Sequence, residues 1–194
     1  MITQYSYGLN TKASQNNNVV DIYKKWSAEE VRADLQSRRT NLVNIICQSR
    51  SDLNTSCVIR SANAFLAKET YVVGRRKIDA RAAVGTGHYE KVFHAENLKE
   101  VVDKLHYLGY TVFAVDNIME YQPQNLWDAE IPEKSAFVYG NESVGLSQED
   151  IELTDRMVYI QQDGAVRSLN VACAAACVMA EYSRRYRSEQ DEIH

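Results

Sequence analysis

Apolar positions follow two different spacings along the chain. Short runs rich in β-branched residues, typical of buried strands, alternate with longer segments in which apolar residues recur every three or four positions, typical of helices. The predicted strands span 42–48, 70–74, 110–116, 135–140 and 157–160. The predicted helices span roughly 28–39, 54–66, 96–109, 147–153 and 168–187. Strand and helix alternate at least four times, which predicts an α/β domain with a mostly parallel sheet and helices on both faces.

Residues at the ends of the helical segments indicate where the helices begin. Ser27 and Glu30 have the spacing of a capping box in front of the first helix, and Ser147 occupies the position of an N-cap. Asn54 is expected to cap the helix that follows it, and Ser168 to open the last helix. These signals fix the predicted starts of four helices.

The overall composition is that of an ordinary globular domain. The 194 residues are 45% hydrophobic and 25% charged. We expect an N-terminal extension with one helix over 1–40, beginning with a polar arm over 1–23, then a main domain over 41–188 and a tail over 189–194. No apolar run approaches the ~18–20 residues of a membrane span, and the first residues lack the apolar stretch of a signal peptide, so we expect a cytoplasmic protein.

The cysteines and histidines predict no metal site. The four cysteines, at positions 47, 57, 173 and 177, form no Cys-x-x-Cys pair, and the four histidines lack the spacing of metal ligands. Cys173 and Cys177 lie four positions apart in an alanine-rich stretch and are expected to be small buried core residues.

Three polar segments go beyond what a plain α/β domain requires. The first carries Asn54 and Arg60, for which a helix cap and a solvated side chain are the simpler interpretation. The second, 140–147, follows a strand directly, where α/β proteins bind ligands, although it also fits a tight turn. The third, 164–170, opens the last helix, whose free backbone N–H groups and polar side chains can hold a substrate or simply cap the helix.

Taken in this order, the three segments resemble the SpoU/TrmH family of RNA ribose 2′-O-methyltransferases, within the SPOUT superfamily. The family pattern has an Asn with an Arg six residues later, then a Gly-Asn-Glu-x-x-Gly-Leu loop, then Ser-Leu-Asn at a helix start. The matching positions are Asn54, Arg60, Gly140, Asn141, Glu142, Gly145, Leu146, Ser168, Leu169 and Asn170. The likeness covers about 42–187, with departures at Ser56 and Leu66, where glycine is common, and at Gln161 and Gln162, where the family often has Pro and Met.

The resemblance implies a fold with a deep C-terminal trefoil knot whose loops hold S-adenosylmethionine (AdoMet) as methyl donor, without a metal. The implied cofactor contacts are Gly140, Asn141, Gly145, Ile160 and Leu169. It also implies a homodimer whose active site is completed across the interface. The helix 168–187 is the expected dimer surface, with an apolar strip formed by Ala172, Ala175, Ala176 and Met179.

The implied reaction is an in-line attack of a ribose 2′-hydroxyl on the activated methyl group of AdoMet, so catalysis consists of positioning and removal of one proton. The family gives that proton to the Arg found here at position 60. Because arginine stays protonated and is a poor base, stabilisation of the developing alkoxide is the other option, and both roles remain open for Arg60. The other implied catalytic residues are Asn54, Glu142, Ser168 and Asn170.

The net charge of −4, taken alone, argues against an RNA-binding protein. Its distribution argues the other way, because residues 24–91 hold 13 Lys and Arg against 7 Asp and Glu, whereas residues 92–163 hold 4 against 14. We expect the basic segment to face the RNA, a tRNA or rRNA with a slight preference for tRNA. The expected RNA contacts are Arg38, Arg39, Arg75, Arg76, Lys77 and Arg167.

Other classes of protein remain as alternatives. A non-catalytic SPOUT-like dimer would bind RNA or AdoMet without reaction, and the filled catalytic positions argue against it. An unrelated α/β nucleotide-binding enzyme would need a glycine-rich phosphate loop after the first strand, and residues 49–56 contain no glycine. A metal-dependent or thiol enzyme is disfavoured by the spacing of the cysteines and histidines.

Overall fold

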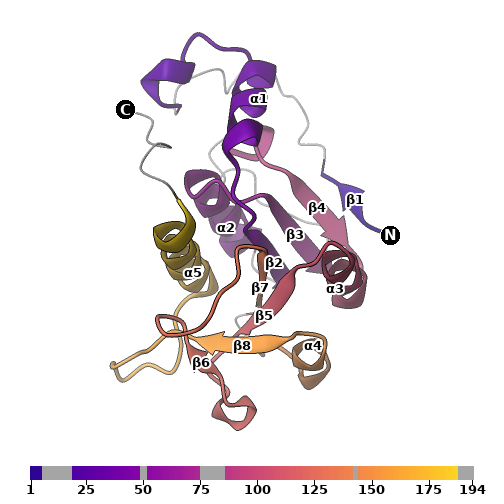
Figure 1. The fold of residues 1–194 in the computed structure, drawn as a ribbon, viewed down its shortest axis with the longest axis vertical. Coiled ribbons are helices and arrows are strands. Elements are labelled where there is room, and N and C mark those ends of the chain that lie inside the picture. Colours follow the sequence, from indigo (N-terminus) through magenta and orange to yellow (C-terminus); the bar gives the residue numbers. More distant parts are fainter. Residues whose placement is uncertain (6–18, 49–51, 75–85, 142–143, 188–194) are drawn as a thin grey trace.

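The computed structural model describes residues 1–5, 19–48, 52–74, 86–141 and 144–187 (Figure 1). The described strands are β1 (Thr3–Gln4), β2 (Val43–Gln48), β3 (Glu69–Gly74), β4 (Val92–Ala95), β5 (Thr111–Val115), β6 (Gln124–Asn125), β7 (Ser135–Tyr139) and β8 (Arg156–Tyr159). The described α-helices are α1 (Ala28–Arg38), α2 (Asp52–Ala64), α3 (Leu98–Tyr107), α4 (Gln148–Glu152) and α5 (Val171–Tyr186). The strands form one sheet in the order β1-β4-β3-β2-β7-β5-β8-β6, and every pairing is parallel except that of β1 with β4.

Helices cover both faces of the sheet, as the alternating pattern predicts. One core cluster contains residues of α3 and α4, namely Leu98, Val101, Val102, Leu105 and Ile151. The other contains residues of α2 and α5, namely Val58, Ala62, Ala175, Val178, Met179 and Tyr182. The central strands read as continuous apolar runs because they are buried on both faces. The α/β class and the mostly parallel sheet are therefore confirmed.

Three short strands have no counterpart in the predicted pattern. β1 pairs with β4 at the sheet edge, with Thr3 opposite His94, so the predicted arm over 1–23 begins with a short edge strand. β4 has four residues and β6 has two. Strands this short offer too few positions for an alternating pattern to stand out from a loop.

Two of the predicted helix caps are wrong. α2 begins at Asp52, so Asn54 lies inside the helix and does not cap it. α5 begins at Val171, and its N-cap is Asn170, whose Oδ1 accepts from the backbone N–H groups of Ala172 at 2.9 Å and Cys173 at 3.4 Å. Ser168 lies two residues before this cap. Asn is among the most favoured N-cap residues, which explains its presence at a helix start.

The other predicted caps are confirmed. Ser27 and Glu30 form the capping box of α1, and Ser147 forms one with Asp150 at the start of α4. Gly109 follows the end of α3 with a φ of +79°, a conformation that glycine adopts without strain.

The orientation of α5 overturns two expectations about its surface. Ala175 and Met179 are fully buried against the sheet and α2, so they cannot belong to an exposed dimer strip. Cys173 is exposed and Cys177 partly so, whereas both were expected to be buried. Small residues, alanine and cysteine, occur on every side of this helix, so the composition alone does not show which side faces the core.

Strand β8 lies between two strands that precede it in sequence. It pairs with β5 through Phe113 and Arg156, and with β6 through Gln124 and Val158. Both neighbours belong to the segment that runs from β5 to β7, so residues 116–123 connect a strand on one side of β8 to a strand on its other side. The chain then continues from β8 through a loop into α5, on one side of the sheet (Figure 1).

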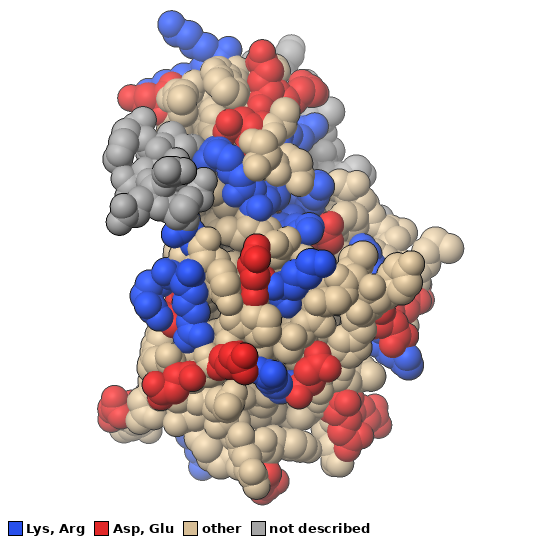
Figure 2. All heavy atoms as spheres, viewed as in Figure 1, with Lys and Arg blue, Asp and Glu red and all other residues tan. Residues whose placement is uncertain are grey.

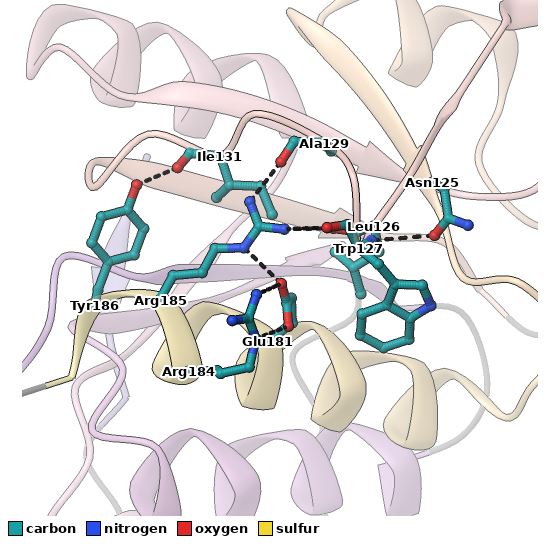
Figure 3. A network of polar contacts seen from close by, with 9 residues as sticks. All are labelled: Asn125, Leu126, Trp127, Ala129, Ile131, Glu181, Arg184, Arg185 and Tyr186. Atoms are coloured by element: carbon teal, nitrogen blue, oxygen red, sulfur yellow. Dashed lines mark hydrogen bonds and ion pairs between the residues drawn. The ribbon is translucent and has the colours of Figure 1, made fainter.

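The end of α5 is fixed to that same segment by a network of charged and polar contacts (Figure 3). Arg185 donates to the carbonyl oxygens of Ala129 at 2.6 Å, Leu126 at 2.9 Å and Trp127 at 3.1 Å. Glu181, which is 5% exposed, accepts hydrogen bonds from Arg184 and Arg185. These hydrogen bonds lower the pKa of Glu181 to about 2, and the bond from Arg184 has the largest effect.

Charge is distributed unevenly over the surface. On the face in Figure 2, Lys and Arg side chains gather at the base of α1, whereas Asp and Glu side chains predominate around α4 and β8. This division agrees with the segregation of charge along the sequence. No helix in the described part of the chain is long and apolar enough to cross a membrane.

Candidate active site

A pocket of about 360 Å³ lies where β5, β7 and β8 end. It is lined by residues that directly follow these strands and by the start of α5. The carboxyl ends of neighbouring parallel strands meet at one edge of a sheet, which is why loops distant in sequence converge here. All five predicted cofactor contacts line the pocket: Gly140, Asn141, Gly145, Ile160 and Leu169.

The loop after β7 folds into a tight turn beside the pocket. Gly145 donates its N–H to the carbonyl oxygen of Asn141 at 2.8 Å and has a φ of +70°. A Cβ at Gly140 would lie 2.4 Å from the carbonyl carbon of Gly145 and 2.6 Å from the backbone nitrogen of Leu146. Only glycine fits at position 140 without moving this backbone. Glu142, a predicted catalytic residue, lies outside the described residues.

The loop after β5 supplies pocket residues to which the sequence analysis does not point. Asp116 and Asn117 both line the cavity. Asp116 Oδ1 accepts from the N–H of Asn117 at 2.8 Å, and its Oδ2 lies 3.5 Å from the backbone nitrogen of Leu146. Asn117 Nδ2 donates to the carbonyl oxygen of Arg167 at 2.9 Å. The sequence does carry a signal for them, because these two polar residues directly follow β5, a buried strand that pairs with β7.

The helices α2 and α5 meet at the pocket through their asparagines. Asn170 Nδ2 donates to Asn54 Oδ1 at 3.1 Å, across 116 positions of sequence. Ser168 and Asn170 both line the cavity. The structure therefore brings three of the five predicted catalytic residues, Asn54, Ser168 and Asn170, to one place.

Arg60 lies outside this pocket. It is exposed on α2, six residues after Asn54, which corresponds to about 9 Å along a helix axis. Within the described part of the chain its guanidinium makes no ion pair or hydrogen bond, so it is available for an external group. Arg167 is also exposed, next to the pocket residue Ser168.

The inner wall of the pocket includes a buried tyrosine. Tyr139 lines the cavity, and its hydroxyl donates to Asn44 Oδ1 at 3.2 Å. Burial raises the pKa of Tyr139 well above its ordinary value, so the hydroxyl stays protonated and serves as a hydrogen-bond donor.

Two of the predicted RNA contacts are engaged within the protein. The side chain of Arg39 is 3% exposed and forms a two-pronged ion pair with Glu90 at 2.8 and 2.9 Å, so the expectation that it contacts RNA is wrong. Arg38 binds Asp34 at 2.6 Å and the hydroxyl of Tyr23 at 2.5 Å, with 19% of its side chain exposed, which likewise disfavours an RNA contact. Arg75, Arg76 and Lys77 lie outside the described residues.

The fold and pocket define the class of protein as an α/β domain with a pocket at the carboxyl edge of a parallel sheet, the place where such folds bind ligands. Residues 41–180 match the SpoU rRNA Methylase family, and the chain belongs to that family. A curated relative, the tRNA (guanosine(18)-2′-O)-methyltransferase of Escherichia coli (strain K12), is 27% identical over 157 residues. The match covers 78% of this chain and 66% of the relative, so the chain spans slightly less than two thirds of that protein's length.

Solved structures share the fold. The TrmH/SpoU tRNA modifying enzyme of A. aeolicus superposes with a TM-score of 0.72 at 22% identity, over 81% of each chain. The SpoU methyltransferase AviRb from Streptomyces viridochromogenes, solved in complex with AdoMet, gives a TM-score of 0.67 at 24% identity, over 78% of this chain and 60% of that one.

Proposed function

We propose that this protein is an AdoMet-dependent RNA methyltransferase that methylates the 2′-hydroxyl of a ribose in tRNA or rRNA. The observation that carries this proposal is the pocket at the ends of β5, β7 and β8. It unites the second and third polar segments of the sequence, and the Asn170–Asn54 hydrogen bond joins the first segment to them. Membership of the SpoU family supports the same activity.

The pocket fits AdoMet as the donor. Its volume of about 360 Å³ falls in the ~300–1,000 Å³ range of small-molecule sites. Gly140 lets the backbone come close to a ligand, and Asp116 offers a carboxylate to a cofactor that carries hydroxyl groups and positive charge. Gly140, Asn141, Gly145, Ile160 and Leu169 would hold the cofactor, which supplies a methyl group already activated on a sulfonium.

The residues of the chain would then position the ribose and handle its proton. Arg60 would bind the adjacent phosphate and stabilise negative charge on the 2′-oxygen, because a guanidinium is a strong donor to phosphate and alkoxide. Asn170 and Asn54, joined at 3.1 Å, would orient the ribose beside the cofactor. Ser168 would contact the ribose from the start of α5, and Glu142 would complete this group from the loop after β7.

We propose that the enzyme works as a homodimer in which Arg60 of one copy serves the pocket of the other. Two features support this arrangement. Arg60 is exposed and lies outside the pocket of its own chain. Exposed apolar side chains occur on the segments that bear site residues, at Leu53, Val144, Val166 and Leu169, as expected of a surface that a second copy covers.

A trefoil knot and a cytoplasmic location complete the proposal. The knot is supported by the position of β8 between β5 and β6, which precede it in sequence, and by the contacts of Arg185 with the segment that contains β6. Among the substrates, the name of the E. coli relative favours tRNA. A tRNA or rRNA substrate in turn favours the cytoplasm, and the donor chemistry requires no metal.

The test is direct. The purified protein is incubated with AdoMet carrying a labelled methyl group and with either bulk tRNA or rRNA, and the RNA is digested to nucleosides. We expect label in a 2′-O-methylnucleoside and its loss in Arg60→Ala. Label on a base would contradict the reaction type. AdoMet or RNA binding without any transfer would indicate the non-catalytic alternative.

A further inference from the structure

A second cavity, of about 390 Å³, lies at the opposite edge of the sheet from the candidate active site. Its walls come from β1, α1 and the segment that leads into β4. The N-terminal extension and the residues before β4 are distant in sequence, and neither belongs to the pocket described above. This cavity therefore needs an explanation of its own.

The cavity is basic. Arg32 is exposed and uses its Nε to donate to the carbonyl oxygen of His88 at 2.6 Å, and among the described residues its two terminal amino groups have no partner and could hold a ligand. Lys91 also lines the cavity and makes no ion pair within the described residues. The acidic wall residue Glu90 is neutralised by Arg39, so the charge that the cavity presents is positive.

The remaining wall residues suit a nucleotide. Tyr5 and Tyr89 contribute aromatic rings, and Gln36 contributes an amide. Basic side chains combined with aromatic rings are the features of sites that bind single-stranded nucleic acid, in which cations hold phosphates and rings stack on bases.

Helix α2 connects this cavity to the candidate active site. At its start Asn54 accepts from Asn170, and near its end Asn63 donates to Glu90 at 2.8 Å. Nine residues of helix separate the two asparagines, or about 14 Å, which is the length of roughly four stacked nucleotides. Arg60 lies between them on an exposed position of the same helix.

We propose that this cavity binds a nucleotide of the substrate RNA, a few residues along the strand from the methylated ribose. Arg32 and Lys91 hold its phosphates, and Tyr5 or Tyr89 stacks on its base. Arg39 acts as a positioning residue, because it fixes the cavity wall by donating to Tyr89 O at 2.8 Å and to Glu90. The inference rests on the proposed function, since it takes RNA as the substrate.

The test measures the affinity of bulk tRNA for the full chain and for the variants Arg32→Ala, Lys91→Ala and the double variant. We expect each single substitution to weaken binding about fivefold and to reduce the salt dependence of binding by about one phosphate contact. Lys99→Ala, on α3 and across the sheet, is the matched control for the lost charge and should leave RNA affinity unchanged.

AdoMet affinity, measured by calorimetry, should stay at the wild-type value in all four variants, which excludes a general loss of folding. RNA affinity in Arg32→Ala and Lys91→Ala equal to that of Lys99→Ala would overturn the inference. That result differs from failure of the proposed function, in which the wild-type protein itself would bind no RNA or transfer no methyl group. Photocrosslinking of thiouridine-containing tRNA should also label peptides within 28–38 or 86–91, and labelling confined to other peptides would contradict the site.

Discussion

Asn170 donates a hydrogen bond from its Nδ2 to Asn54 Oδ1 at 3.1 Å, while its own Oδ1 caps α5. The cap decides which end of the Asn170 amide is the donor, and this in turn decides that Asn54 offers its oxygen. One backbone requirement, the satisfaction of two N–H groups at a helix start, thereby orients a second side chain that lies on another helix.

This relationship separates stability from activity at position 170. Asn170→Ser keeps a good cap but loses the donor to Asn54, so we expect its free energy of unfolding to stay within about 0.5 kcal/mol of the wild-type value. Asn170→Ala loses the cap as well and should cost about 1 kcal/mol. Both variants should transfer methyl groups at least about tenfold more slowly, measured as a single turnover. Full activity of Asn170→Ser would show that the link to Asn54 has no catalytic role.

Gly140 gives a sharp test of the cofactor pocket. The Cβ of Gly140→Ala would lie 2.4 Å from the Gly145 carbonyl carbon, so the loop must move, and we expect AdoMet affinity to fall by at least about tenfold. Gly164→Ala is the control, because its Cβ would meet nothing within 4 Å. Calorimetric titration with AdoMet measures both. Equal affinities in the two variants would place the cofactor elsewhere.

Substitutions at Arg60 separate the effect of its positive charge from the effect of its planar guanidinium group. Arg60→Ala removes an exposed side chain, so stability should change by less than about 0.5 kcal/mol while methyl transfer falls by roughly 10²–10³. Arg60→Lys keeps the positive charge without the planar guanidinium. A rate for Arg60→Lys well above that of Arg60→Ala would show that an amine cation at this position can contribute to catalysis, whereas equally inactive variants would indicate that the guanidinium itself is required.

Mixing two inactive variants tests whether the active site is shared between copies. A mixed dimer of Arg60→Ala and Gly140→Ala contains one intact pocket that faces an intact Arg60 from the other copy. We expect methyl transfer to reappear after the two proteins are unfolded and refolded together, with each variant refolded alone as the control. Absence of recovery, with mixed dimers demonstrated by mass spectrometry, would mean that Arg60 serves its own chain.

The ion pairs of Glu181 predict a pH dependence of stability. Arg184 and Arg185 lower the pKa of this carboxylate to about 2, below its unfolded value of about 4.3. A depressed pKa stabilises the folded state above the unfolded pKa, and the stabilisation is lost as the pH falls from about 5 to 2. We expect a contribution on the order of 2 kcal/mol at pH 7. Glu181→Gln should lower the free energy of unfolding at pH 7 and flatten its decline in acid, measured by denaturant titration.

Much of the fold is predictable from the sequence because its signals are local. The five predicted strands, β2, β3, β5, β7 and β8, are apolar runs, and Ser27 and Ser147 carry their capping partners three residues away. The short strands β1, β4 and β6 depend on pairing with distant partners, which no local pattern reveals. Likewise, the start of α5 depends on whether Ser168 or Asn170 is the N-cap, and both are good capping residues.

In the candidate site, too, features with a local sequence signal are predictable, whereas contacts between distant residues are not. The resemblance to the SpoU/TrmH family implies that Gly140, Ile160 and Leu169 contact one cofactor, and these three residues do line one pocket. Arg39 looked like an exposed cation, yet its partner Glu90 is 51 residues away, and only the folded chain brings them together. Asp116 matches no motif, and only its place directly after β5 indicates a role in the pocket.

The insertion of β8 between β5 and β6 has a consequence for the order in which the protein becomes functional. A nascent chain that has emerged from the ribosome through β7 already holds most of the sheet, but it lacks Ile160, Leu169 and the cap of α5. The far wall of the pocket is thus built from the residues that enter the structure last and that make contacts distant in sequence, such as that between Asn170 and Asn54. Ligand binding should therefore report the completion of folding, and a cofactor that binds only the finished pocket should slow unfolding from this end of the chain.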